Sequence, residues 1–488
     1  MVFSSLLFLL AFLPLNLVCY FIAKKIRTRN IVLLVFSLFF YAWGEPVYVA
    51  VLLFMSFCCW RFSLRLESEK TRHGRKGWLL NAVIVCIGTI CIFKYTGFMI
   101  QNLNLLPFFN IPVPKISLPI GISFYTFQLL TYVVDVYRGE VHAQKQYYKV
   151  LLYAGLFHQC IAGPIVRYGD IEAEIRSRRT TLDSLYAGLT RFICGLAKKT
   201  ILANSCGALV DMLLLSDGEI GDVSLLAQNL ETLQSRSALT LWIGMAFYML
   251  QIYLDFSAYS DMAIGLGLIC GFHYKENFRY PYISGSITEF WRRWHISLGS
   301  FFRDYVYIPL GGNRNGKMRT YLNLLIVWAL TGLWHGASWN FVLWGLYFYF
   351  FLVLEKTMLR NMLNKSRILK HVYVIAVTYF GWVFFRFTQP ELLQAVFRGM
   401  FCGNGNPILT YESFRLALRC LLFFTICCAA CTPLIPALRN RLLVKGRKNR
   451  RTARAEQILI ILIPCVLLLL SVVALTGDTY NPFLYFQF

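Results

Sequence analysis

Charged side chains are scarce in this sequence. They make up 15% of its 488 residues, whereas a soluble protein of this length carries about 25%. Hydrophobic residues account for 57% of the chain, and the mean hydropathy is +0.55. No long stretch has the composition of a soluble globular domain, which argues against a separate aqueous domain. We therefore predict one membrane domain covering residues 1–488.

The sequence also lacks the motifs of several large enzyme classes. It contains no G-x-S-x-G nucleophile elbow, no H-E-x-x-H zinc motif and no P-loop. Gly265-Leu266-Gly267 lies in an apolar run and is not followed by the third glycine of a dinucleotide-binding loop. The lack of a recognisable serine or cysteine nucleophile favours direct group transfer over a covalent enzyme intermediate.

Acidic residues are half as frequent as basic ones, 24 against 48, so the formal net charge is +24. The basic residues gather in short tracts at the ends of apolar runs, without the interleaved polar surface of a nucleic-acid groove. We therefore predict no nucleic-acid partner. Such tracts are typical of the cytoplasmic loops of membrane proteins, where they also meet anionic lipid. They occupy residues 24–29, 61–76, 360–370 and 439–454.

Fifteen cysteines raise the question of a metal site or disulfides. Most lie inside apolar runs, where cysteine behaves as a small hydrophobic residue. Cys428 and Cys431 form a CxxC, but no second pair or histidine follows at zinc spacing. We predict no metal site.

Apolar stretches long enough to cross a bilayer, roughly 17–25 residues, recur along the whole chain. They predict an all-α polytopic membrane protein with roughly eleven to thirteen transmembrane or re-entrant helices. Residues 31–60 and 321–356 each divide into two spans, at Gly44-Glu45-Pro46 and near Gly336. Segments 185–210 and 290–310 are predicted to be interfacial or re-entrant. The other predicted spans are 3–23, 78–98, 116–134, 148–166, 238–272 (tilted or broken), 371–387, 416–436 and 457–476.

The N-terminal apolar segment predicts the orientation of the protein. Residues 2–23 have no basic region before them and no small-residue cleavage site after them, so they form a first span and not a cleaved signal. With the N-terminus outside, each strongly basic loop falls on the cytoplasmic side, as the positive-inside rule requires. Both termini are then extracytoplasmic.

Polar residues interrupt the apolar pattern most strongly at 273–320, and three of the seven histidines, His273, His295 and His335, lie in or near this region. Polar groups at membrane depth usually line a site or cavity. His335 lies between two apolar runs, among small residues. A desolvated, neutral imidazole there can act as a general base, although a packed histidine at a helix bend explains the pattern equally well. His295 can orient a substrate or polarise a thioester carbonyl, or it can be an interfacial residue. His158, inside a predicted span, is expected to make a structural hydrogen bond.

Three segments of the chain carry a family resemblance. Residues 283–298 (ISGSITEFWRRWHISL), 302–313 (FRDYVYIPLGGN) and 331–336 (TGLWHG) together resemble the core of the membrane-bound O-acyltransferase family. The branch resembled most is the bacterial alginate O-acetyltransferase group. Residues 253–261, 161–168 and 483–488 match as well, so the likeness spans nearly the whole chain, with its signature core at 253–340.

The resemblance implies a ring of helices around a tunnel that crosses the plasma membrane of a bacterium, with the catalytic histidine inside. His335 corresponds to that histidine, and His295 to the second signature position. Candidate substrate-binding residues in the same motifs are Trp291, Arg303, Asp304, Asn313 and Trp334.

The resemblance also implies an acyl thioester donor, acetyl-CoA in the first instance, and no bound cofactor. The donor is expected to enter from the cytoplasmic side, where its phosphates can contact the basic residues Arg303, Arg314, Lys317 and Arg319. The acceptor is a hydroxyl of an exported polysaccharide or of an extracytoplasmic acetyltransferase-like partner, and the protein works with polysaccharide machinery.

Two alternatives remain open from the sequence. D-alanyl transfer to teichoic acid uses the same chemistry and would need a carrier-protein docking surface. A polysaccharide exporter or flippase is the other alternative, although the inverted repeats common in transporters are not visible here.

Overall fold

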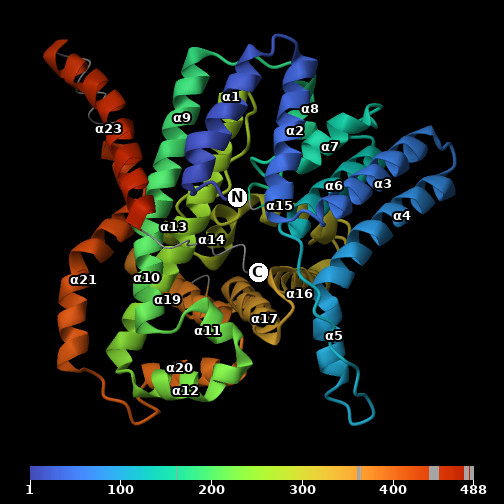
Figure 1. Cartoon of the computed structure of the whole chain (residues 1–488). Helices are drawn as coiled ribbons and strands as arrows, with labels where there is room; N and C mark the ends of the chain where they lie inside the picture. Colours follow the sequence, from blue (N-terminus) through green and yellow to red (C-terminus); the bar gives the residue numbers. More distant parts are fainter. Residues whose placement is uncertain (162, 360–362, 364, 439–449, 478–482, 484–488) are drawn as a thin grey trace. The chain divides into compact units, whose positions relative to one another are not determined.

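The computed structural model describes residues 1–161, 163–359, 363, 365–438, 450–477 and 483, and the regular structure in these ranges is helical throughout (Figure 1). The prediction of an all-α protein is confirmed. The basic segment 439–449 and residues 484–488, used above for topology and resemblance, lie outside the described residues. The chain forms two compact units, residues 1–196 with 259–277 and 482–488, and residues 197–258 with 278–481.

Eight helices in the described part of the chain are long and apolar enough to cross a membrane. A polytopic membrane protein is therefore confirmed. They are Ile26–Gly44, Val49–Ser68, Arg72–Leu103, Ala238–Cys270, Trp339–Leu359, Arg367–Arg386, Tyr411–Ala430 and Ile458–Gly477, with a shorter apolar helix at Phe8–Ile22.

Several predicted spans differ from the observed helices. The span predicted at 148–166 is interrupted, because α7 (Tyr147–Gly155) ends in a turn. The segment 185–210, predicted to be interfacial or re-entrant, is continuous helix, from α9 (Leu182–Ala197) through a π-helical stretch, η3 (Lys198–Ala203), into α10 (Asn204–Leu213). Apolar composition cannot distinguish these cases, since backbone hydrogen bonding decides whether a helix continues.

The first unit is built mainly from the N-terminal helices. Phe3, Phe8, Phe40 and Phe157 pack edge-on or tilted against one another with ring centroids 5.0–6.5 Å apart, and they form its aromatic core. Its other helices are η1 (Phe8–Phe12), α1 (Leu13–Ile22), α2 (Ile26–Gly44), α3 (Val49–Ser68), α4 (Arg72–Ile90), η2 (Cys91–Tyr95), α5 (Thr96–Leu103), α6 (Ile122–Arg138) and α8 (Tyr168–Arg176).

His158 lies in the turn after α7, in the first unit, and is fully buried. Its Nδ1 is 3.2 Å from the hydroxyl of Tyr274. The structural hydrogen bond expected for this histidine is present.

Helix α13 (Ala238–Cys270) is unbroken over 33 residues, about 50 Å at 1.5 Å per residue. Residues 238–258 belong to the second unit and residues 259–270 to the first. In the second unit its Asp255 pairs with Lys199 at 2.7 Å, both almost fully buried. Such burial requires pairing, because an isolated charge in an apolar interior is very costly.

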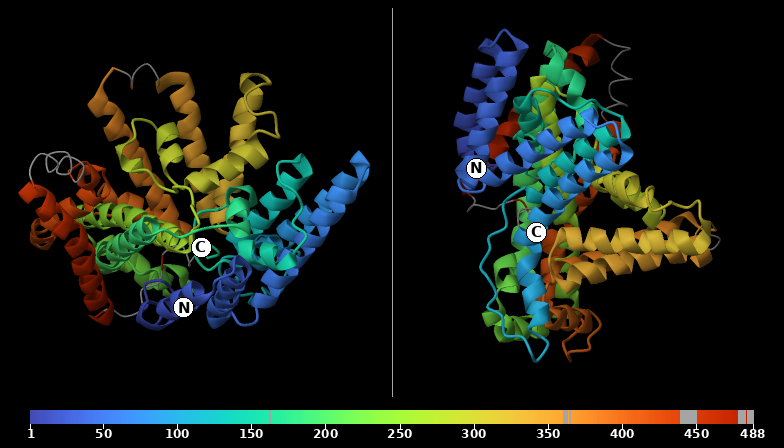
Figure 2. Two further views of the ribbon diagram at one scale, coloured as in Figure 1. Left: turned by 90° about the horizontal axis from the view of Figure 1, so that it is seen from above. Right: turned by 90° about the vertical axis from the view of Figure 1, so that its right-hand side faces the viewer.

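The second unit carries the motifs of the signature core. Helices α16 (Gly316–His335) and α17 (Trp339–Leu354) run beside each other, joined by the short turn Gly336–Ser338 (Figure 2). The predicted division of 321–356 near Gly336 matches the end of α16 and the start of α17, and α17 lies within one of the eight apolar helices above. The remaining elements are α11 (Asp217–Gly221), η4 (Val223–Leu225), α12 (Leu226–Ser235), η5 (Pro281–Ile283), α14 (Ile287–Arg293), α15 (Ile296–Phe302), η6 (Arg303–Tyr307), η7 (Glu355–Leu359), α19 (Arg367–Arg386), α20 (Pro390–Met400), α21 (Tyr411–Ala430) and α23 (Arg450–Gly477).

Candidate active site

His335 is the last residue of α16 and is buried, with 5% of its surface exposed. Three aromatic rings surround its imidazole: Trp334 at 5.0 Å, Trp344 at 4.9 Å and Phe385 at 5.2 Å between centroids, all nearly perpendicular to it. These rings come from α16, α17 and α19. Such a setting desolvates the imidazole and disfavours its charged form.

Glycines fix the position of α16 against α17. A Cβ on Gly345 would lie 2.3 Å from the carbonyl oxygen of Trp328, and one on Gly332 would lie 2.3 Å from the carbonyl oxygen of Phe341. Only glycine allows the two backbones to approach this closely. The small residues beside His335 therefore serve helix packing, and that packing determines where the imidazole lies.

His295 stands between α14 and α15 in the left-handed conformation, with φ of 44°. This φ turns the chain sharply, so that α15 begins directly after the histidine. The imidazole is 2% exposed and packs against Phe256 at 4.8 Å and Trp334 at 5.8 Å. Burial lowers the pKa of His295 well below its usual range, so the ring is neutral at physiological pH.

The first turn of α14 is held by a carboxylate from another element. The side chain of Glu355, in η7 after α17, accepts hydrogen bonds from the backbone N–H of Thr288 at 3.1 Å and from its hydroxyl at 3.0 Å. It also accepts from the backbone N–H of Ile287. Ser286 caps the same helix by accepting from the N–H of Glu289 at 3.0 Å. Because α14 leads into His295, these contacts set the start of that segment.

The structure brings the two histidines to one aromatic cluster. Trp334 contacts both, at 5.8 Å from His295 and 5.0 Å from His335. Trp291 on α14 joins through Trp344, at 5.4 Å. Four of the residues predicted from the sequence, His335, His295, Trp334 and Trp291, therefore lie together in the second unit.

The other predicted site residues lie at exposed positions or beside them. Arg303, in η6, is exposed and pairs with its neighbour Asp304 at 2.7 Å. Asn313 and Arg314 are exposed in the turn before α16, and Lys317 and Arg319 are exposed in the first turn of that helix. The sequence motif is continuous through these positions, but the chain leaves the buried cluster after α15. These residues belong to the same sequence motif as His295, but that did not predict that they would lie beside the two histidines.

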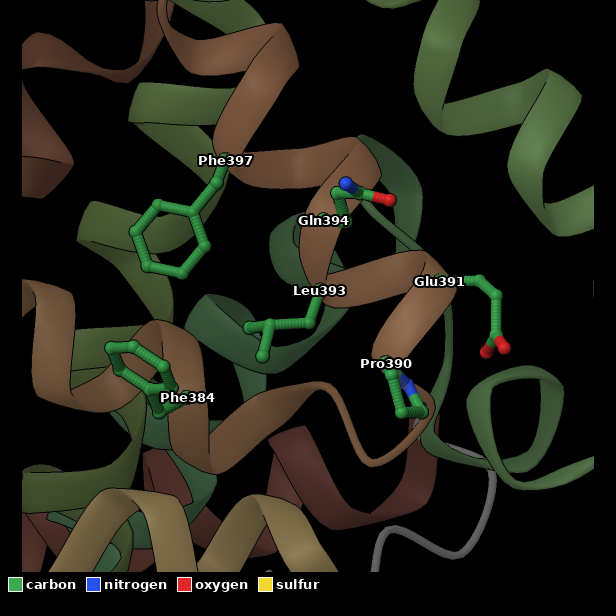
Figure 3. A pocket seen from close by; sticks show the side chains of 6 residues that line it. All are labelled: Phe384, Pro390, Glu391, Leu393, Gln394 and Phe397. Atoms are coloured by element: carbon green, nitrogen blue, oxygen red, sulfur yellow. The ribbon is translucent and has the colours of Figure 1, made fainter. Parts of the chain in front are cut away.

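A hollow of about 560 Å³ lies beside the end of α19 and α20, and neither histidine lines it. In Figure 3 the side chains of Phe384, Leu393 and Phe397 point to the same side, whereas Glu391 and Gln394 point the other way. Phe384 lines this hollow, while the next residue, Phe385, packs against His335. The end of α19 thus separates the hollow from the histidine cluster.

No group of three or more His, Cys, Asp or Glu side chains in the described residues is arranged to hold a metal ion. The chemistry that the cluster offers is that of buried imidazoles and indoles.

A comparison with protein families decides the class of the protein. The sequence model of the MBOAT, membrane-bound O-acyltransferase family, matches residues 6–393. The chain belongs to this family. It is an enzyme, an O-acyltransferase of the membrane.

Several curated proteins are similar to this acyltransferase. The "Probable alginate O-acetylase" of Pseudomonas putida is 36% identical, over 100% of both chains. The "Peptidoglycan O-acetyltransferase" of Helicobacter pylori is 30% identical, over 83% of this chain and 80% of its own. The "Teichoic acid D-alanyltransferase" of Bacillus subtilis is 27% identical, over 47% of this chain and 56% of its own.

Sequence reasoning missed three residues of the acyltransferase that shape the cluster: Trp344, Glu355 and Phe385. Trp344 and Phe385 lie in strongly apolar helices, where an aromatic residue usually signals lipid contact or core. Glu355 offered a signal, because it is an acidic residue directly after an apolar run of 14 residues, 341–354, and buried carboxylates require partners.

Proposed function

We propose that this acyltransferase moves an acetyl group from a cytoplasmic thioester, acetyl-CoA, to a hydroxyl of an exported polysaccharide or of an extracytoplasmic partner protein. His335 removes the proton of the incoming hydroxyl as its oxygen attacks the thioester carbonyl. The carbon–sulfur bond then breaks, and the departing thiolate takes the proton from the imidazole. His295 orients the acceptor hydroxyl.

The environment of His335 carries this proposal. A general base must be neutral before the reaction, and an imidazole enclosed by Trp334, Trp344 and Phe385 is held in that form by desolvation. The second imidazole, His295, contacts the same Trp334 ring. Two imidazoles that contact one indole suit a reaction in which one accepts the proton of a hydroxyl and the other orients that hydroxyl. Such a reaction requires no serine or cysteine nucleophile.

The comparisons favour acetyl transfer over D-alanyl transfer. The relatives named for O-acetylation align with 83–100% of this chain, whereas the relative named for D-alanyl transfer aligns with 47%. Exposed cations at Arg314, Lys317 and Arg319 can meet the phosphates of a coenzyme donor. The exporter alternative accounts for neither the buried imidazole pair nor the family membership.

We place the protein in the plasma membrane of a bacterium, as one membrane domain with both termini extracytoplasmic. The helices form a ring around a tunnel, so that the donor reaches His335 from the cytoplasm and the acceptor from the opposite side. The partners are polysaccharide machinery and an acetyltransferase-like protein that completes delivery.

The test is His335→Ala. General-base catalysis contributes about 10²–10⁴-fold, so membranes carrying this variant should lose nearly all transfer of radiolabelled acetyl groups from acetyl-CoA to the exported polysaccharide. Immunoblotting of the membrane fraction should show normal insertion.

His142→Ala is the matched control, since that histidine is largely exposed and pairs with Glu67 at 3.0 Å. It should keep wild-type transfer. Normal acetylation by the His335→Ala protein would refute the mechanism, and a wild-type protein that moves glycan without acetyl transfer would refute the function.

A further inference from the structure

Trp344 carries a buried hydrogen-bond donor that no group among the described residues satisfies. The residue is fully buried, and its indole Nε1 has no hydrogen-bond partner in the described part of the chain. A buried donor without a partner costs about 1–3 kcal/mol, and a buried indole N–H usually finds an acceptor. Two other tryptophans of the protein do find one: Trp242 donates to the carbonyl of Met400 at 2.9 Å, and Trp60 donates to that of Gln144 at 2.8 Å.

The position of Trp344 links this donor to the reaction. Its ring lies 4.9 Å from that of His335, at an interplanar angle of 79°. The indole of Trp291 also has a buried N–H without a partner in the described residues, but it contacts Trp344, at 5.4 Å, one ring further from His335. Trp344 is thus a fully buried indole, in direct ring contact with the base, whose N–H has no partner among the described residues.

Trp344 is also held rigidly. Phe348 packs on its ring at 5.2 Å and Phe385 at 5.5 Å. The next residue, Gly345, presses its backbone against Trp328 of α16, the helix that ends in His335. A donor and a base fixed by the same helix pair keep their relative position through the reaction, which is what electrostatic preorganisation requires.

We propose that Trp344 is a further catalytic residue, whose indole N–H stabilises the oxyanion formed from the thioester. This rests on the proposed function. As the acceptor oxygen bonds to the carbonyl carbon and its proton passes to His335, the electron pair of the carbonyl double bond moves to the carbonyl oxygen. Trp344 donates a hydrogen bond to that oxygen. When the double bond re-forms, the carbon–sulfur bond breaks and the thiolate leaves with the proton from His335.

The experiment removes the N–H and keeps the ring. In the full-length protein, benzothienylalanine replaces Trp344, so that sulfur stands where the N–H was, and Trp344→Phe serves as a genetically encoded companion. Loss of one oxyanion donor lowers kcat by about 10²–10³-fold, and we expect this fall with KM for acetyl-CoA little changed. Trp328→Phe is the matched control, an aromatic exchange in the same cluster, 6.1 Å from Trp344, and should leave kcat close to wild type.

A spectroscopic readout separates catalysis from packing. The infrared carbonyl band of bound, ¹³C-labelled acetyl-CoA, measured in the His335→Ala background to prevent turnover, should lie at higher frequency when Trp344 lacks its N–H. An unchanged band together with unchanged kcat would overturn the proposal. So would equal loss of kcat in Trp328→Phe, which would show a packing effect. If the wild-type protein transfers no acetyl group, the proposed function fails instead.

Discussion

At the scale of single residues, His295 combines an unusual backbone with a buried imidazole. A φ of 44° is uncommon for side chains other than glycine, asparagine and aspartate, and it is costly for β-branched residues. The residue therefore has two separable roles. Its backbone turns the chain from α14 into α15, and its ring faces Phe256 and Trp334.

These roles predict different outcomes for two substitutions. His295→Asn keeps a side chain that accepts positive φ, so the thermal unfolding temperature in detergent should stay near wild type, while acetyl transfer should fall at least about tenfold, or 1.4 kcal/mol in the barrier. His295→Val should in addition lose about 1–3 kcal/mol of stability through backbone strain. Equal stability of the two variants would contradict the strain argument, and full activity of His295→Asn would remove the imidazole from the mechanism.

At the scale of elements, the pairing of α16 with α17 positions both His335 and Trp344. The backbones of these helices approach closely at Gly345, where an added Cβ would lie 2.3 Å from the carbonyl oxygen of Trp328. An oxygen of the main chain cannot move aside as a flexible side chain can. The whole helix must shift instead.

Gly345→Ala should therefore destabilise the protein by about 1–3 kcal/mol, as overpacking does, and should reduce acetyl transfer, because α17 carries Trp344. Gly77→Ala in α4 is the matched control, since nothing lies within 4 Å of its added Cβ. That variant should be neutral or more stable by up to about 1 kcal/mol. Thermal unfolding and transfer assays on both proteins check the pair, and the same result for both would exclude a specific helix contact.

At the scale of the whole molecule, the orientation in the membrane determines which substrate reaches the site from which side. The positive-inside rule puts the loop around Lys70 in the cytoplasm and the loop around Gly405 outside. Both loop positions are exposed.

Alkaline phosphatase inserted at Gly405 should be active, and at Lys70 inactive, because the enzyme folds only after export. Green fluorescent protein at the same two positions should give the opposite pattern. Phosphatase activity at Lys70 would reverse the topology, and with it the assignment of the donor to the cytoplasmic side.

The sequence by itself determined the class of the molecule: an all-helical membrane protein of the O-acyltransferase family, with two candidate catalytic histidines, His295 and His335, in its signature core. The length of apolar runs and the presence of short motifs are local properties, so both can be read from the sequence without knowledge of the fold. The break after Gly155, inside the span predicted at 148–166, was missed, because composition is the same whether or not the helix continues.

Only the tertiary structure decided which residues surround His335. The elements that carry Trp344, Phe385 and Glu355, whose carboxylate holds the first turn of α14, have no visible relation to the motifs in the sequence. Asn313, in contrast, lies within a motif yet is exposed. The reason is physical. Contacts between helices depend on how closely their backbones approach, and here that distance is set by single glycines facing carbonyl groups many residues away.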